Sequence, residues 1–240
     1  MTKLRSAALT DIGCVRTENE DCYIHEVDRM FFGVADGIGG LPGGAEAALA
    51  TVTTIIEGLA ASPVDRTPNL RAIVHAANRA VLDRGQDVSP VMGIGSTLTF
   101  GCVRDHLLLL AHVGDSRAYV WRAGSLEGLT EDHSVENEAR MRRERGEIVH
   151  FHESNRAALT RCIGQPTPPE VDLLVRPLIA GDRYLFCTDG VTRMIGDREL
   201  GLLMGQKDDP KILADEIVDL AVRRGGPDNA TAVVVIVDEA

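Results

Sequence analysis

The sequence lacks the features of an exported or membrane-spanning protein. Its first residues contain no apolar segment of the kind found in signal peptides, and no stretch approaches the roughly 18 uninterrupted apolar residues of a membrane span. No C-x-x-C pair occurs, and an odd number of cysteines, several in apolar runs, indicates small buried hydrophobic residues in a reducing compartment. We therefore expect a soluble cytoplasmic protein. The five cysteines are Cys14, Cys22, Cys102, Cys162 and Cys187.

Positive charge is also scarce. The chain has 25 Lys and Arg against 36 Asp and Glu, a formal net charge of -11. Such an excess argues against binding to bare DNA or to an anionic membrane surface, so we expect neither nucleic acid nor a membrane as a partner.

Several common catalytic motifs are missing. The glycine-rich residues 37–44 do not complete G-x-G-x-x-G, and G-K-[ST] is absent, which disfavours nucleotide binding. No H-E-x-x-H occurs, and neither Ser96 nor Ser116 lies in the sequence context of a serine nucleophile. The glycine-rich segment instead predicts a sharp turn where backbone approaches a site closely.

The length and the apolar pattern predict one domain of the α+β class. A chain of 240 residues can form one compact domain, and it contains no internal repeat or linker. We expect a monomer with a single domain over residues 1–240. The pattern predicts helices at 44–56, 69–83, 133–145 and 210–224, and strands at 6–10, 30–35, 97–103, 107–113, 117–121, 182–188 and 231–237.

The order of these elements predicts the sheets. The links at 104–106 and 114–116 are short enough for hairpins, which favours antiparallel pairing. Helices come in pairs and strands in runs, as in a sandwich of two sheets with helix pairs outside. The strand at 231–237 is entirely apolar, which predicts a central position with both faces covered.

Acidic residues recur where predicted strands end. Taken singly, an Asp-Gly pair is more often a turn than a ligand. Several carboxylates converging at one rim would repel one another unless divalent cations lay between them. Their recurrence therefore favours a metal-dependent hydrolase. The acidic corners are Glu20-Asp21, Asp36-Gly37, Asp115, Asp189-Gly190 and Asp228-Asn229.

Arg16 lies four residues before Glu20 and has two interpretations. It either forms a surface charge pair with Glu20, or its planar guanidinium binds two phosphate oxygens beside the metals. The residues alone leave both open.

Together with the residues around them, these acidic corners and Arg16 resemble the motifs of a bacterial member of the metal-dependent (PPM, type 2C) serine/threonine protein phosphatase family. The resemblance covers nearly the whole length, in family order. It implies a four-layer αββα sandwich in which two antiparallel β-sheets are flanked by pairs of α-helices. The matching blocks are 11–21, 34–40, 95–97, 112–119, 129–134, 159–164, 181–191 and 228–231.

The resemblance also implies a two-metal centre. Asp36 would bridge the metals, Asp189 and Asp228 would complete one site, and Glu20 and the Gly37 carbonyl would serve the other, mostly through waters. Donors that are all oxygen atoms suit Mn²⁺ or Mg²⁺ rather than zinc.

Three more residues acquire expected roles from the resemblance. Asp21 would act from behind the ligands or hold a metal-bound water, and Asp115 together with Asp189 matches the position of a third, weaker metal. Arg16 matches the arginine that binds phosphate and, with Asp36, is the expected catalytic residue.

The implied reaction is hydrolysis of phosphoserine and phosphothreonine monoesters in proteins, by in-line attack of a hydroxide that bridges the metals. The enzyme would serve signalling by opposing a bacterial Ser/Thr kinase, and its partners would be that kinase and other phosphorylated proteins. The alternatives are a phosphatase of small phosphometabolites and a non-catalytic regulatory module of the same fold.

One departure from the family pattern bears on the mechanism, and one matching segment bears on the substrate. Ile38 follows Asp36-Gly37 where eukaryotic relatives often have a histidine proposed as general acid, and His150 or His152 would replace it only if their loop folded inward. Residues 134–155 correspond to the family's flap. Its arginines either form a solvated helix face paired with glutamates or steer phosphorylated proteins to the site. They are Arg140, Arg142, Arg143 and Arg145.

Overall fold

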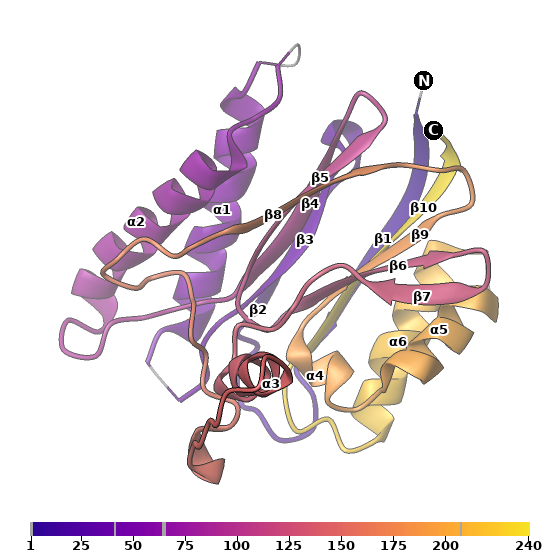
Figure 1. Ribbon diagram of the computed structural model, residues 1–240. Helices are drawn as coiled ribbons and strands as arrows, with labels where there is room; N and C mark the ends of the chain where they lie inside the picture. Colours follow the sequence, from indigo (N-terminus) through magenta and orange to yellow (C-terminus); the bar gives the residue numbers. More distant parts are fainter. Residues whose placement is uncertain (1, 41, 64–65, 207) are drawn as a thin grey trace.

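The computed structural model describes residues 2–40, 42–63, 66–206 and 208–240, which form two antiparallel five-stranded sheets (Figure 1). One sheet has the order β1-β10-β9-β6-β7 and the other β2-β3-β4-β5-β8. The strands are β1 (Lys3–Asp11), β2 (Asp21–Glu26), β3 (Phe31–Asp36), β4 (Leu98–Arg104), β5 (Leu107–Val113), β6 (Arg117–Arg122), β7 (Ser125–Gly128), β8 (Asp172–Pro177), β9 (Arg183–Cys187) and β10 (Ala230–Glu239).

The helices lie mainly on the two outer faces (Figure 1). They are α1 (Gly44–Ala61), α2 (Leu70–Val88), α3 (Val135–Glu144), α4 (Asp189–Thr192), α5 (Asp197–Gln206) and α6 (Pro210–Arg223), with 3₁₀ turns η1 (Val27–Arg29) and η2 (Glu153–Asn155). The pair α1 and α2 covers the sheet that contains β3, and the pair α5 and α6 covers the sheet that contains β10. The predicted α+β sandwich of four layers is confirmed.

Three apolar clusters hold the layers together. Phe32, Val34 and Phe186 belong to the cluster between the two sheets. Ile55 and Phe100 belong to the cluster under α1 and α2, and a third cluster lies under α5 and α6. Burial of apolar surface on both faces of each sheet is the main source of stability in such a layered fold.

Strand β10 confirms the prediction of a central strand. It pairs with β1 on one side and β9 on the other. Its residues from Ala230 to Val237 are buried, on both faces of the sheet. An unbroken apolar run is what such a position requires.

The ends of the long helices are set by local capping. The side chain of Asn69 accepts a hydrogen bond from the Ala72 N–H at the start of α2, and Asp209 caps α6 ahead of Pro210. Helix α1 is long and apolar enough to meet the length and composition criteria for a membrane span. Its buried residues, including Val52 and Ile55, pack in the core beneath α1 and α2, which explains that composition.

One predicted connection is wrong. The link at 104–106 is a hairpin between β4 and β5, as predicted, but the link at 114–116 is not, because β5 and β6 belong to different sheets. The chain crosses between the sheets at Gly114, whose φ is +116°. The neighbouring strands are buried, so the apolar pattern does not distinguish a hairpin from a crossing.

Some elements escaped prediction. Strands β2, β7 and β8 each lie at the edge of a sheet. Strand β7 has only four residues, and neither β7 nor β8 contains a buried residue, so their sequences carry a weak strand signal. Helices α4 and α5 were also missed, and they follow the buried strand β9.

The cysteines correct a second expectation. All five are free thiols, and Cys102 and Cys187 are buried. Cys14, however, is exposed, because it lies in the loop after β1, where its N–H donates to the Gly226 carbonyl, rather than in a strand.

Candidate active site

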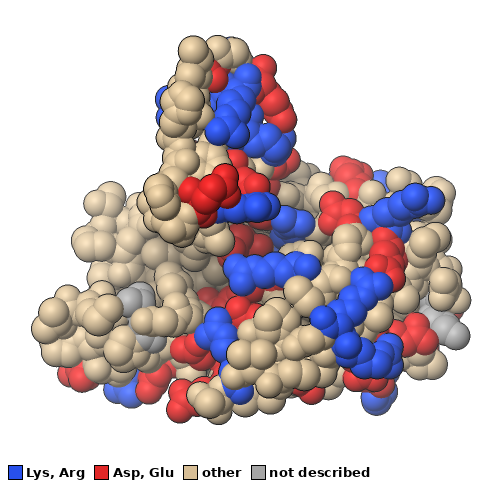
Figure 2. All heavy atoms as spheres, turned by 90° about the horizontal axis from the view of Figure 1, so that it is seen from below, with Lys and Arg blue, Asp and Glu red and all other residues tan. Residues whose placement is uncertain are grey.

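A cleft of about 570 Å³ opens at the end of the sandwich where strands of both sheets finish. Figure 2 looks at this end of the molecule and shows acidic and basic side chains gathered around the hollow beside a projecting lobe. The cleft is lined by Arg16, Asp36, Gly37, Ile38, Gly39, Thr97, Asp115, Ala157, Ala158, Leu159, Cys162, Asp189, Arg193 and Asp228.

The acidic residues reach the cleft from the ends of separate strands. Asp36 is the last residue of β3, and Asp115 follows β5. Asp189 is the first residue of α4, just after β9, and Asp228 precedes β10. Carboxylates far apart in the sequence are thereby placed around one space, as the strand-end pattern predicted.

Asp21 lies behind this space rather than on its wall. It is the residue opposite Asp36 in the β2–β3 pair and is only 7% exposed. Its Oδ2 accepts hydrogen bonds from the hydroxyls of Thr188 (2.8 Å) and Thr231 (2.6 Å). Its Oδ1 is buried and has no hydrogen-bond partner among the described residues.

Glu20 lies next to the cleft and depends on Asn229 for its position. The Asn229 Oδ1 accepts from the Glu20 N–H at 2.8 Å, and the Asn229 Nδ2 donates to the carbonyls of Ile12 (2.9 Å) and Glu18 (3.0 Å). From the sequence, Asn229 is expected only to form a turn before the last strand. The buried amide instead holds the loop before β2 against the start of β10.

Arg16 pairs with two acidic residues and also lines the cleft. Its Nη1 donates to Glu20 Oε2 at 3.2 Å and its Nη2 to Asp228 Oδ2 at 2.9 Å, while the guanidinium forms part of the cleft wall. A Cβ at Gly39 would lie 2.6 Å from Nη1 of this arginine, so glycine leaves room for the guanidinium. In the same way, a side chain at Gly44 would collide with the Glu20 carboxylate.

A basic residue of the cleft, Arg193, was missed. It forms ion pairs with Asp189 and, at 3.5 Å, with Asp228. An Asp-Gly pair taken singly is most often a turn, but at Asp189-Gly190 the chain makes a helical turn, α4, which brings residues four apart together. The i,i+4 spacing of an aspartate and an arginine was the available signal.

Burial and mutual repulsion raise the pKa values of the acidic cluster. Burial is the larger cause and raises the pKa of Asp21 and of Asp115 to about 7, with neighbouring Asp189 adding to both. Burial, followed by the charges of Asp21 and Asp189, raises the pKa of Asp36 well above its usual value. Burial also raises the pKa of Asp189, which Arg193 opposes. A nearby cation would favour the ionised forms.

The donor atoms fit divalent cations. No group of three His, Cys, Asp or Glu side chains among the described residues forms a complete metal-binding set as it lies. Two carboxylate oxygens, Oδ1 of Asp21 and Oδ1 of Asp189, are nevertheless buried without a hydrogen-bond partner. Buried polar atoms are nearly always satisfied, and hard carboxylate oxygens are typical ligands of Mg²⁺ and Mn²⁺. The residues present therefore suit such ions.

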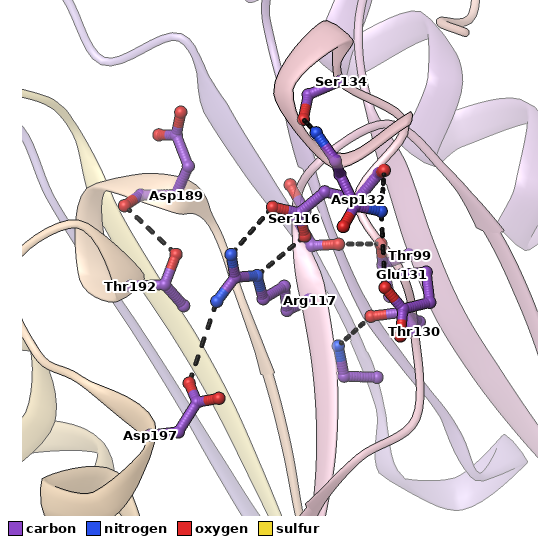
Figure 3. A network of polar contacts seen from close by, with 12 residues as sticks. Thr99, Ser116, Arg117, Thr130, Glu131, Asp132, Ser134, Asp189, Thr192 and Asp197 are labelled. Carbon is purple, nitrogen blue, oxygen red and sulfur yellow. Dashed lines mark hydrogen bonds and ion pairs between the residues drawn. The ribbon is translucent and has the colours of Figure 1, made fainter. Parts of the chain in front are cut away.

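A polar network joins the two sheets next to the cleft, and Figure 3 shows the part of it around Ser116 and Arg117. The Thr97 hydroxyl oxygen accepts from the Asp36 N–H at 3.0 Å and lies 2.7 Å from the Ser116 hydroxyl. Arg117 then binds both oxygens of Asp132 at 2.7 Å. The backbone on either side of Asp115 is thus tied to Asp36 and to the segment that leads into α3.

The flap arginines lie outside the cleft. Arg140 pairs with Glu144 at 2.6 Å and Arg142 with Glu147 at 2.7 Å. Arg143 lies over the Phe151 ring at 5.3 Å and donates to the Val149 carbonyl. Among the described residues of this part of the chain, the cleft is lined instead by Ala157, Ala158 and Leu159, while His150 and His152 are exposed elsewhere.

Comparisons with known proteins agree with the fold. The serine/threonine protein phosphatase PstP of Mycobacterium tuberculosis is 34% identical over 233 residues, covering 96% of this chain but only 44% of PstP. A putative protein phosphatase 2C-type of Streptococcus pyogenes is 32% identical, with 94% of each chain covered. The crystal structure of a PstP catalytic domain in complex with two manganese ions superposes with a TM-score of 0.80, at 31% identity and full coverage of both chains.

The sequence profile of one family matches most of the chain. The profile is that of protein phosphatase 2C, and the match extends over residues 5–230. This range contains every acidic residue of the cleft as well as Arg16 and Arg193. The chain is therefore a member of the protein phosphatase 2C family.

Proposed function

We propose that this chain is a metal-dependent phosphatase that hydrolyses phosphoserine and phosphothreonine in proteins. The observation that carries the proposal is the convergence of Asp36, Asp189 and Asp228 on one cleft with the guanidinium of Arg16. The names of the relatives, serine/threonine protein phosphatases, support the substrate class.

The proposed metal ligands are the oxygen donors around the cleft. Asp36 would be shared by two cations, with Asp189 and Asp228 on one side, and with Glu20 and the Gly37 carbonyl on the other. The two manganese ions in the related PstP catalytic domain support two core cations, of either Mn²⁺ or Mg²⁺. When bound, such cations lower the pKa of water toward neutrality and offset charge on the phosphoryl oxygens.

Two buried polar residues behind the cleft, Asp21 and Asn229, position these ligands. Asp21 holds Thr188 and Thr231, which lie next to Asp189 and at the start of β10. Asn229 holds the backbone of Glu20. Rigid strand ends fixed in this way keep the donors in place without rearrangement, which is what electrostatic stabilisation of a transition state requires.

Arg16 is the proposed phosphate-binding residue. Its ion pairs with Glu20 and Asp228 fix the direction of the guanidinium, and about a third of the side chain remains exposed (32%). A planar guanidinium donates to two phosphoryl oxygens at once, which orients the phosphorus for in-line attack and stabilises the developing negative charge.

The wall around Ile38 bears on the leaving group. Ile38 and Leu159 are apolar, so neither donates a proton to the departing alcohol. We assign that proton to water in the cleft. Without an acid at position 38, turnover of different phosphate esters should depend strongly on the pKa of the leaving alcohol.

Cellular partners are part of the same proposal. The family membership supports phosphorylated proteins as substrates, among them a bacterial Ser/Thr kinase whose action the enzyme would reverse in signalling. We further propose that the chain acts in the cytoplasm as a monomer, and that residues 134–155 form a flap of the single domain that contacts the substrate protein.

A phosphopeptide assay tests the function. We expect hydrolysis of a phosphothreonine peptide in Mn²⁺ or Mg²⁺, its loss in EDTA, and no hydrolysis by Asp36→Ala under any of these conditions. Turnover of small phosphometabolites far above that of any phosphopeptide would replace protein with metabolite as the substrate. Absence of hydrolysis of either class in both metals would contradict the proposed activity.

A further inference from the structure

We propose that Arg193 is a tethered cation of the active site, which takes the place of a third divalent ion beside Asp115 and Asp189. The inference rests on the proposed function and deepens it, since it specifies how many metal ions this particular cleft accepts.

The turn that carries Arg193 is rigid. The Arg193 N–H donates to the Asp189 carbonyl at 2.8 Å, and the Ile195 N–H donates to the Val191 carbonyl at 2.9 Å. Val191 and Ile195 are fully buried in the cluster under α5 and α6. The arginine side chain therefore leaves a fixed point, one helical turn after Asp189, and is directed back over that aspartate.

The guanidinium is bound to two of the proposed metal ligands. Its Nη2 pairs with Asp189 Oδ2, and its Nη1 lies 3.5 Å from Asp228 Oδ2. The second oxygen of Asp189, Oδ1, is left buried and unpartnered. Arg193 thus occupies one oxygen of Asp189 and leaves the other for a cation of the core pair.

Arg193 and Arg16 approach the same carboxylate from two sides of the cleft. Both donate to Asp228 Oδ2, Arg16 from the loop after β1 at 2.9 Å and Arg193 from the end of α4. The Arg193 side chain is 45% exposed, so it also faces the open cleft. Two guanidinium groups then frame the position that a phosphoryl group would take.

Asp115 is the remaining carboxylate on this side. It lines the same cleft as Asp189 and Arg193. A third divalent ion held by Asp115 and Asp189 would sit against the guanidinium already bound to Asp189. Like charges at one carboxylate repel, so the two cations compete for this place.

Counting bound manganese on the full chain tests the inference. After chelation and dialysis, Mn²⁺ is added and the bound ions are counted by electron paramagnetic resonance, which separates free from bound Mn²⁺, and by calorimetry. We expect two ions on the wild-type chain, and a third on Arg193→Ala and on Arg193→Met that binds at least tenfold more tightly than any third ion on wild type.

Two variants serve as controls. Arg193→Lys keeps the charge and should bind two ions, and Arg198→Ala removes an exposed arginine outside the cleft wall and should also bind two. Arg193→Met retains most of the aliphatic stem in case Arg193→Ala fails to fold.

The possible results separate the inference from the function beneath it. Three ions on the wild-type chain, or two on a folded Arg193→Ala and Arg193→Met, would overturn the role of Arg193 and leave a metal-dependent phosphatase intact. A wild-type chain that binds no Mn²⁺ would overturn the proposed function and the inference together.

Discussion

Strand β9 carries a buried aspartate beyond each of its ends, and the two have opposite surroundings. At one end, Asp182 is 1% exposed and receives Arg122 on both oxygens at 2.6 Å, the Tyr184 hydroxyl at 3.0 Å and the Ile179 N–H at 3.0 Å. At the other end, Asp189 is 8% exposed, and one of its oxygens has no partner.

The difference separates a carboxylate with a full set of donors from one that lacks them. Asp182 has every donor it needs, so its charge stabilises the fold and leaves no free coordination. Asp189 lies among other carboxylates in a cleft, where burial and repulsion destabilise its ionised form. A protein keeps such a residue when a ligand completes its coordination.

The first prediction concerns the loss of a carboxylate from the cleft. Asp36→Ala should lower turnover of p-nitrophenyl phosphate by at least roughly a thousandfold, because a shared oxygen ligand of the proposed metal pair is lost. Circular dichroism should show the native fold, since the change removes a carboxylate that its neighbours repel. A folded Asp36→Ala protein that is active without metal would refute the assignment.

The second prediction concerns the stability that cations provide. Mn²⁺ at about 100 times its Kd should stabilise the wild-type chain by about 2.7 kcal/mol, which raises Tm by roughly 5–10 °C. EDTA should remove the increase, and Asp36→Ala should lose most of it. Thermal unfolding with and without Mn²⁺ measures this, and an equal increase in Asp36→Ala would argue against ion binding in the cleft.

The third prediction concerns the loss of the fully paired carboxylate, Asp182. Asp182→Asn should lower the free energy of unfolding by about 2–3 kcal/mol, since Arg122 loses a charged partner but is 30% exposed and regains water. Turnover per folded molecule and the Mn²⁺-dependent rise in Tm should not change. Urea denaturation and the p-nitrophenyl phosphate assay check both points, and a loss of activity like that of Asp36→Ala would erase the distinction.

The smallest expected effect lies in the flap, where exposed arginines such as Arg142 are paired with glutamates. Replacing Arg142 and Arg143 together by Ala should lower kcat/KM for a phosphoprotein about two- to tenfold, if they steer the substrate by long-range attraction. The same variant should hydrolyse a small aryl phosphate at the wild-type rate. Equal effects on both substrates, or none on either, would favour a purely solvated helix face.

The sequence was most informative where residues are buried in a regular pattern. The central strand β10 and the long helices α1, α2 and α6 follow from apolar periodicity alone. The edge strands β7 and β8 did not, because β7 has only four residues and neither strand contains a buried residue. Neither did the crossing at Gly114, because a short link between two buried strands is compatible with a hairpin and with a change of sheet.

The site shows the same division. Asp36, Asp115 and Asp189 were identifiable because each ends or follows an apolar strand, and Asp228 because it precedes one. Arg193 was not, because its place in the cleft depends on α4 being a helical turn, and Asp-Gly favours other turns equally. The role of Asn229 could not be predicted either. Its bonds to Ile12 and Glu18 join parts of the chain more than 200 residues apart, and no local pattern reveals such contacts.

Anomalous diffraction from crystals grown with manganese tests the central claim most directly. The account predicts two manganese peaks in the cleft, with Asp36 between them and with Asp189 and Asp228 on one of them. Manganese bound only elsewhere on the chain, with the cleft carboxylates turned away from one another, would contradict it.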